Sequence, residues 1–144
     1  MPRLARDGCM LRPAMNWLVR FAMRAMLPRG AGLPGVEDTG LDEFVPRLRR
    51  ESAGLFWAGV VLGAVVFQLT PLVTIFVPLP ACLLSARLLE RHTQKITAHP
   101  LYLLRSPMLL LKVSAGYCWG AHPDVRKVIG LAPYPSDPEE WRTG

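Results

Sequence analysis

The chain has 144 residues, which is enough for one compact domain but not for two. Hydrophobic residues make up 51% of it and charged residues only 19%, a balance that excludes an intrinsically disordered chain. The 17 Lys and Arg residues outnumber the 11 Asp and Glu residues and give a formal net charge of +6. A free soluble monomer normally carries more surface charge, so the composition indicates a chain covered by a membrane or by a partner protein.

The run AMNWLVRFAMRAML, residues 14–27, has the pattern of a basic amphipathic helix. Arg20 and Arg24 fall on one narrow stripe at helical spacing, and apolar side chains cover most of the remaining surface. Such a helix can lie in a membrane interface, with Trp17 and Phe21 at headgroup depth and the arginines reaching phosphates. It can equally pack into a core with both arginines in solvent, and the sequence leaves these two interpretations open.

The N-terminal region of residues 1–35 therefore consists of this helix and a connector. Pro28 and the glycine-rich run 29–35 end the helix. A secretory signal needs a continuous apolar stretch, which Arg20 and Arg24 interrupt here, and no clear small-residue cleavage site follows. We therefore expect no cleaved signal peptide.

Residues 52–86 contain no charged side chain. Within them, residues 55–77 read LFWAGVVLGAVVFQLTPLVTIFV, which as one helix would be about 35 Å long, against about 30 Å for a hydrocarbon core. Basic residues flank both ends, which also suits a membrane hairpin that turns near Pro71. Burial against a partner protein is the third possibility, and all three stay open. In the membrane arrangements, Phe56 and Trp57 would contact lipid.

The second half of the chain has helical periodicity throughout. Residues 80–97 and 101–119 each predict a helix with one polar face, and proline and glycine signals bound a short helix at 123–130. Residues 136–144 form a polar tail. Because no long alternating apolar pattern occurs, we expect a single all-α domain of four to six short helices with no sheet.

No pattern of residues indicates an independent reaction. The chain has no phosphate-binding glycine loop, no nucleophile motif and no paired metal ligands at short spacing. Its cysteines and histidines are widely separated, which supports neither a disulfide framework nor a zinc site. These residues are Cys9, Cys82, Cys118, His92, His99 and His122. We expect no catalytic residue, no metal and no cofactor of its own.

The net positive charge does not predict a nucleic-acid partner. The arginines are spread along apolar helices instead of being clustered beside aromatic side chains on a polar face. An anionic membrane surface accounts for the same charge, so we expect a lipid bilayer as a partner and no nucleic acid.

Two runs within residues 80–135, LLSARLLERHTQ and LYLLRSPMLLLKVSAGYCWGAHPDVRKVIGLAPY, resemble a known family. It is the small accessory subunit of flavin dehydrogenases of the glucose–methanol–choline class, as in gluconate 2-dehydrogenase. The shared pattern is an Arg-bearing helix, an Arg ahead of an apolar helix with Lys, an aromatic pair, a P-x-V turn and an I-G end. The matching positions are Arg87, Arg105, Lys112, Tyr117, Pro123, Val125, Ile129 and Gly130.

The resemblance implies a small helical subunit without chemistry of its own, while the flavin and the substrate pocket belong to a larger dehydrogenase subunit. Unlike that family, this chain has the uncharged segment 52–86, and we expect it to have no exported-protein leader. We therefore expect it at the cytoplasmic membrane, either integral or tightly peripheral. The expected function is a non-catalytic accessory subunit that stabilises a flavin-dependent oxidoreductase and docks it at the membrane. The alternative is a stand-alone small membrane protein that organises lipids or another membrane complex.

Aromatic and basic side chains dominate interface energetics, and they supply the candidate contact residues. The candidates for partner binding are Arg105, Lys112, Tyr117, Trp119, Tyr134 and Trp141. The candidates for membrane contact are Trp17, Arg20, Phe21, Arg24, Phe56 and Trp57.

Overall fold

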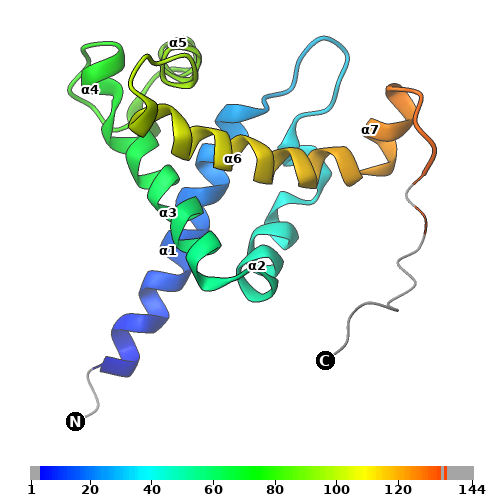
Figure 1. Ribbon diagram of the computed structural model, residues 1–144, viewed down its shortest axis with the longest axis horizontal. Coiled ribbons are helices and arrows are strands. Elements are labelled where there is room, and N and C mark those ends of the chain that lie inside the picture. The colour runs from blue at the N-terminus through cyan, green and yellow to red at the C-terminus, as the bar shows by residue number, and fades with distance from the viewer. Residues whose placement is uncertain (1–3, 134, 136–144) are drawn as a thin grey trace.

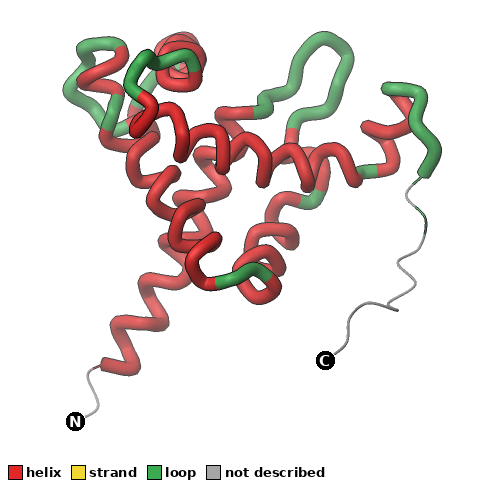
Figure 2. Tube along the Cα trace, in the orientation of Figure 1, coloured by secondary structure: helices red, strands yellow, loops and turns green. Residues whose placement is uncertain are grey.

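Three long helices, α1 (Leu4–Met26), α3 (Gly54–Leu69) and α6 (Tyr102–Ala121), pack on one another at the centre of the molecule (Figure 1). The computed structural model describes residues 4–133 and 135, with side chains from residue 12 onward. Over this part of the chain every regular element is a helix and no strand occurs (Figure 2). The prediction of an all-α fold is confirmed.

Shorter elements surround the three central helices. Helix α2 (Leu41–Glu51) packs on α1, while α4 (Pro71–Thr74) and α5 (Ala86–Thr97) lie together at one end of α6. Helix α7 (Pro123–Val128) follows the opposite end of α6 (Figure 1). Single 3-10 turns, η1 (Val36–Thr39) and η2 (Ala81–Leu83), precede α2 and α5. The described residues thus hold seven α-helices, more than the four to six expected.

One continuous core lies between α1, α3 and α6. Its fully buried side chains recur at helical spacing on each of the three helices, and full burial of one large apolar side chain stabilises the fold by about 1.5–3 kcal/mol. They include Val19, Ala22 and Met23 on α1, Val60, Ala64 and Phe67 on α3, and Met108, Leu111 and Ala115 on α6.

A glycine sets the distance between α3 and α6. A Cβ atom at Gly63 would lie 2.9 Å from the Pro107 carbonyl oxygen and 3.2 Å from the Leu111 side chain. The first of these distances is shorter than a van der Waals contact, and its partner is backbone that cannot rotate away. Any larger residue at position 63 must therefore push the two helices apart.

Of the arrangements left open for the apolar run 55–77, the single continuous helix is wrong. Helix α3 ends at Leu69, where the Thr70 hydroxyl donates to the Val66 carbonyl at 2.7 Å. Pro71 has no N–H to continue the ladder and instead begins the one-turn helix α4. This division accounts for the additional helix. None of the helices in the described part of the chain combines the length and the apolar character needed to cross a bilayer.

The predicted helix boundaries also need correction at two places. The helix expected from Pro80 begins only at Ala86, because the preceding residues form η2 and the Cys82 N–H donates to the Gln68 side-chain oxygen at 3.0 Å. This bond from a residue of α3 holds the segment in a turn. Helix α1 begins at Leu4, ten residues before the expected start, and continues through Pro13.

We expect Gly63→Ala to destabilise the fold by about 1–3 kcal/mol, because the added methyl group overpacks the α3–α6 contact. Gly116→Ala is the matched control on α6, since a Cβ there meets nothing within 4 Å and alanine is the better helix former by about 1 kcal/mol. Urea unfolding followed by circular dichroism measures both. Equal effects of the two variants would contradict the close contact.

Candidate docking surface

An apolar groove runs between the outer faces of α3 and α6. Helix α3 is apolar on all sides, so packing against α1 and α6 buries only part of its surface. Leu62 on α3 and Leu109 on α6 remain 57% and 62% exposed. The lining of the groove consists of Gly59, Leu62, Ser106, Pro107, Leu109, Leu110 and Val113. Large apolar side chains gathered around a groove are typical of a binding surface and uncommon on the solvent-exposed surface of a monomeric protein.

A second exposed apolar region lies around α4 and the segment that follows it. We call it the apolar apex and define it as Leu69, Leu72, Val73, Phe76, Leu79 and Leu83, all of which are exposed. Phe76 is 81% exposed and has a positive φ of 58°, a conformation that costs a non-glycine residue about 1–2 kcal/mol. The chain thus holds a large aromatic side chain in solvent in an unfavourable backbone conformation.

Charges pair in the first third of the molecule. The Asp42 carboxylate accepts a hydrogen bond from Arg20 at 2.8 Å and lies 3.7 Å from Arg24. Arg29 donates to both carboxylate oxygens of Asp38, and these hydrogen bonds lower the pKa of Asp38. The acids of η1 and α2 therefore neutralise arginines from α1 and the connector.

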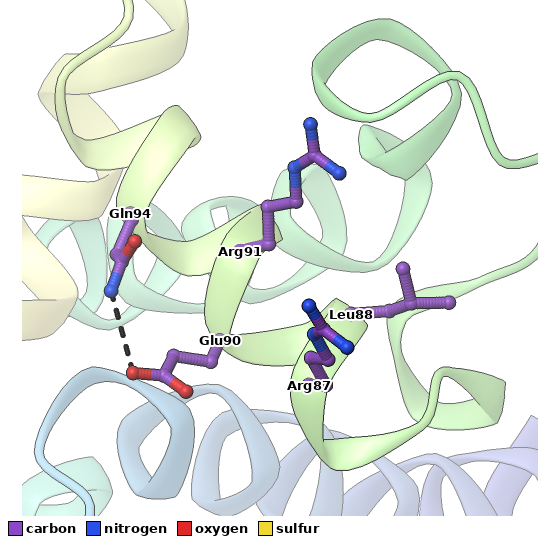
Figure 3. Close-up of a pocket in the computed structure, with 5 residues that line it drawn as sticks. All are labelled: Arg87, Leu88, Glu90, Arg91 and Gln94. Atoms are coloured by element: carbon purple, nitrogen blue, oxygen red, sulfur yellow. Dashed lines mark hydrogen bonds between the residues drawn. The ribbon is translucent and has the colours of Figure 1, made fainter.

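The cations between residues 52 and 121 have no ion-pair partner among the described residues. From residue 52 to residue 121 the sequence contains one acid, Glu90, and five cations. Glu90 accepts a hydrogen bond from Gln94 at 3.4 Å, and Arg87 and Arg91 extend from α5 without joining that pair (Figure 3). None of the cations forms an ion pair with a residue that the structure describes. These five are Arg87, Arg91, Lys95, Arg105 and Lys112.

The residues predicted to bind a partner do not all gather on one surface. Arg105 and Lys112 are both exposed on α6, about one helical turn before and after Leu109, and Lys112 lines a separate groove that α6 forms with α1 and α5. Tyr117 is 67% exposed and borders a separate groove between α2 and α6. Trp119 is half-buried instead, and its indole N–H donates to the Pro34 carbonyl at 2.8 Å. Tyr134 and Trp141 lie outside the described residues.

The residues predicted to contact a membrane are mostly engaged within the fold. Trp17 is about half exposed and stacks on Phe21 at 5.7 Å between ring centroids, and Phe21 in turn packs against Phe67. Arg20 and Arg24 face Asp42, as described above. The two aromatic residues near the start of α3, which are Phe56 and Trp57, are half-buried against the core.

A buried histidine ties α5 to the end of α3. His92 Nε2 lies 2.9 Å from the Phe67 carbonyl oxygen, which only accepts, so Nε2 carries the proton. Nδ1 lies 2.5 Å from the Thr74 hydroxyl, whose one proton is shared between Nδ1 and the Thr70 carbonyl oxygen at 3.0 Å. Burial lowers the pKa of His92, and the hydrogen bond to Phe67 opposes this effect. Helical periodicity puts His92 on the apolar side of α5, in line with Leu88 and Ile96, but nothing in the sequence identifies Thr74 as its partner.

The described residues offer no cluster of metal-ligating side chains, since no three His, Cys, Asp or Glu residues of that part of the chain come together. Cys82 is exposed. Cys118 is buried, and this burial raises the pKa of its thiol, against a smaller opposing effect of the hydrogen bond to Thr39. A thiol in this state is a poor nucleophile at neutral pH.

Sequence reasoning missed the residues of the groove and of the apolar apex as individual contact sites. The only signal for them was the length of the uncharged run, which does not distinguish buried positions from exposed ones. A helix that is apolar on every side has no periodicity from which its exposed face can be recognised.

Comparison with known proteins adds no assignment: no family model, no curated protein and no solved structure matches this chain.

The histidine network predicts that the protein loses stability in mild acid. The unfolded chain binds a proton at His92 with an ordinary pKa of about 6.5, whereas the folded protein binds it only at lower pH. The free energy of unfolding therefore falls as the pH decreases below about 6.5 and levels off below the folded pKa. Urea unfolding from pH 8 to pH 5 measures this slope. His92→Leu should flatten the slope relative to the wild type, and identical slopes would contradict the network.

Proposed function

We propose that this protein is a non-catalytic accessory subunit that binds a larger flavin-dependent oxidoreductase and docks it at the membrane. The observation that carries the proposal is the apolar groove between α3 and α6, which the described residues leave open. The described part of the chain covers its central core but not the outer sides of α3 and α6. A partner surface would supply that cover.

The composition of the groove suits a protein partner. Its walls are mostly aliphatic, as the centre of a protein interface usually is. Two cations of α6 lie close to Leu109 in sequence, although neither lines the groove itself: Arg105 is one helical turn before it, and Lys112 borders the neighbouring groove toward α1 and α5. The two cations also favour an acidic border on the partner.

The resemblance of residues 80–135 to the small subunits of glucose–methanol–choline flavin dehydrogenases supplies the class of partner. It places the flavin and the chemistry in the larger subunit. The five unpaired cations and the apolar apex support a role at the membrane, because a surface that is both apolar and basic matches an anionic bilayer.

Leu109→Arg should abolish the complex with the larger subunit. The substitution puts an additional charge in the centre of the groove, where the partner would have to bury it without a counter-ion, and we expect at least a thirtyfold loss of affinity. Val128→Arg on α7 is the matched control, because Val128 is equally exposed at 58% and lies away from the groove.

Purification of the tagged full chain from its native cells in mild detergent provides the measurement. The wild type and the Val128 variant should retain a larger, yellow subunit with flavin absorbance, and the Leu109 variant should lose it. A colourless, homogeneous oligomer of the wild-type chain alone would overturn the proposal.

A further inference from the structure

We propose that the apolar apex and the basic stripe on α5 together form a binding surface for an anionic lipid bilayer. The basic stripe is defined as Arg87, Arg91 and Lys95. This inference rests on the proposed function and deepens it, since it names the part of the molecule that faces the membrane and the headgroup chemistry that it recognises.

The apolar apex supplies the part that enters the bilayer interface. Its six side chains are aliphatic apart from Phe76, and all are exposed on α4 and the segments directly beside it. The exposed Leu101, Tyr102 and Leu103 at the start of α6 extend the same end of the molecule (Figure 1). Aromatic rings and leucines are the side chains that settle at headgroup depth.

The basic stripe supplies the charge. Arg87, Arg91 and Lys95 are spaced four residues apart, so they share one face of α5, and all three are exposed. None forms an ion pair with a described residue, and Figure 3 shows Arg87 and Arg91 extended away from the helix. Long cationic side chains beside an apolar surface can reach phosphates while their alkyl stems stay on that surface.

The apolar apex and the basic stripe are held in one arrangement. Helix α5 packs on α4, and His92, on a different face of α5 from the stripe, bonds to Thr74 of α4 and to the Phe67 carbonyl of α3. Gln68 also accepts from the Cys82 N–H beside the apolar apex. The apolar apex and the basic stripe are therefore already fixed relative to each other before binding, so association does not incur the entropic cost of ordering them.

Charge complementarity selects the bilayer as the occupant. Helix α2 also carries three arginines, but the same helix contains three acids, one of which forms the pair Arg47–Glu51 at 2.9 Å. The α5 stripe has only Glu90, which bonds to Gln94. Each basic side chain near an anionic membrane surface strengthens binding roughly fivefold, so three of them predict a preference on the order of a hundredfold.

Flotation of the full-length chain with vesicles tests the proposal. Vesicles of phosphatidylcholine alone are compared with vesicles that also contain phosphatidylglycerol, at physiological salt. We expect the chain to float with the anionic vesicles and to bind the neutral ones on the order of a hundredfold more weakly. Equal binding to both, or binding to neither, would overturn the proposal.

Two pairs of variants locate the surface. The triple variant Arg87→Gln, Arg91→Gln, Lys95→Gln should lose the preference for anionic vesicles, while Arg47→Gln, Arg49→Gln, Arg50→Gln removes the same charge from α2 and should keep most of it. Phe76→Ser should weaken binding to anionic vesicles by roughly tenfold or more, whereas Leu131→Ser, at another exposed apolar position, should not. Equal losses of vesicle binding within either pair would show that binding depends on total charge or total hydrophobicity and not on this particular surface, and would overturn the proposal.

Assembly with the flavin-containing subunit, measured on the same variants, separates this inference from the proposed function. A chain that binds that subunit but no vesicle leaves the accessory role standing and removes the membrane surface. A chain that shows the vesicle preference and the variant losses, but binds no flavoprotein, keeps the membrane surface and removes the accessory role.

Discussion

The contact between α3 and α6 at Gly63 governs how the rest of the chain can be arranged. The missing side chain lets the Pro107 carbonyl and Leu111 approach α3 closely, and α1 then packs against both helices. The buried core forms on the inner sides of this crossing. The outer sides of α3 and α6 are left without cover, because the chain supplies no further helix there within the described residues. The same contact that closes the core therefore creates the groove.

The distribution of charge divides the molecule in a similar way. The acids of η1 and α2 meet arginines from α1 and from the connector, with Asp42 serving Arg20 and Arg24. Such exposed pairs each stabilise the fold by less than about 1 kcal/mol, but they cancel charge locally. The helices from α3 to α6 contain a single acid, Glu90, and their cations form no ion pair with a described residue. An apolar surface beside unpaired cations suits a bilayer or an acidic partner, whereas the α1–α2 side is largely self-neutralised.

Local sequence patterns did not reveal which of the candidate contact residues are engaged within the fold. Trp119 is of a residue type that is common in interfaces, but its indole N–H donates to the Pro34 carbonyl and so holds the connector on α6. Arg20 and Arg24 formed a basic stripe in sequence, and a carboxylate twenty-two residues from Arg20 is their partner. These partners come from other elements of the fold, so no local pattern indicates them. The exposure of Leu62, Leu72 and Phe76 likewise depends on tertiary structure, since it results from how α3 packs and from the break in the helix at Pro71.

The sequence by itself determined the all-helical class, confirmed by the lack of a strand in the described residues, and the helix predicted over 101–119, which the structure has at 102–121. These features depend on apolar periodicity and on proline and glycine signals that act locally. The sequence also determined that the chain has more apolar surface than it can bury. The tertiary structure alone decided where α3 ends, where α5 begins and which apolar side chains stay exposed. Those features depend on bonds and contacts between distant residues, such as Gln68 with Cys82 and Gly63 with Pro107. A uniformly apolar segment has no pattern that specifies which of its sides will be buried, so packing against neighbouring elements alone decides which side that is.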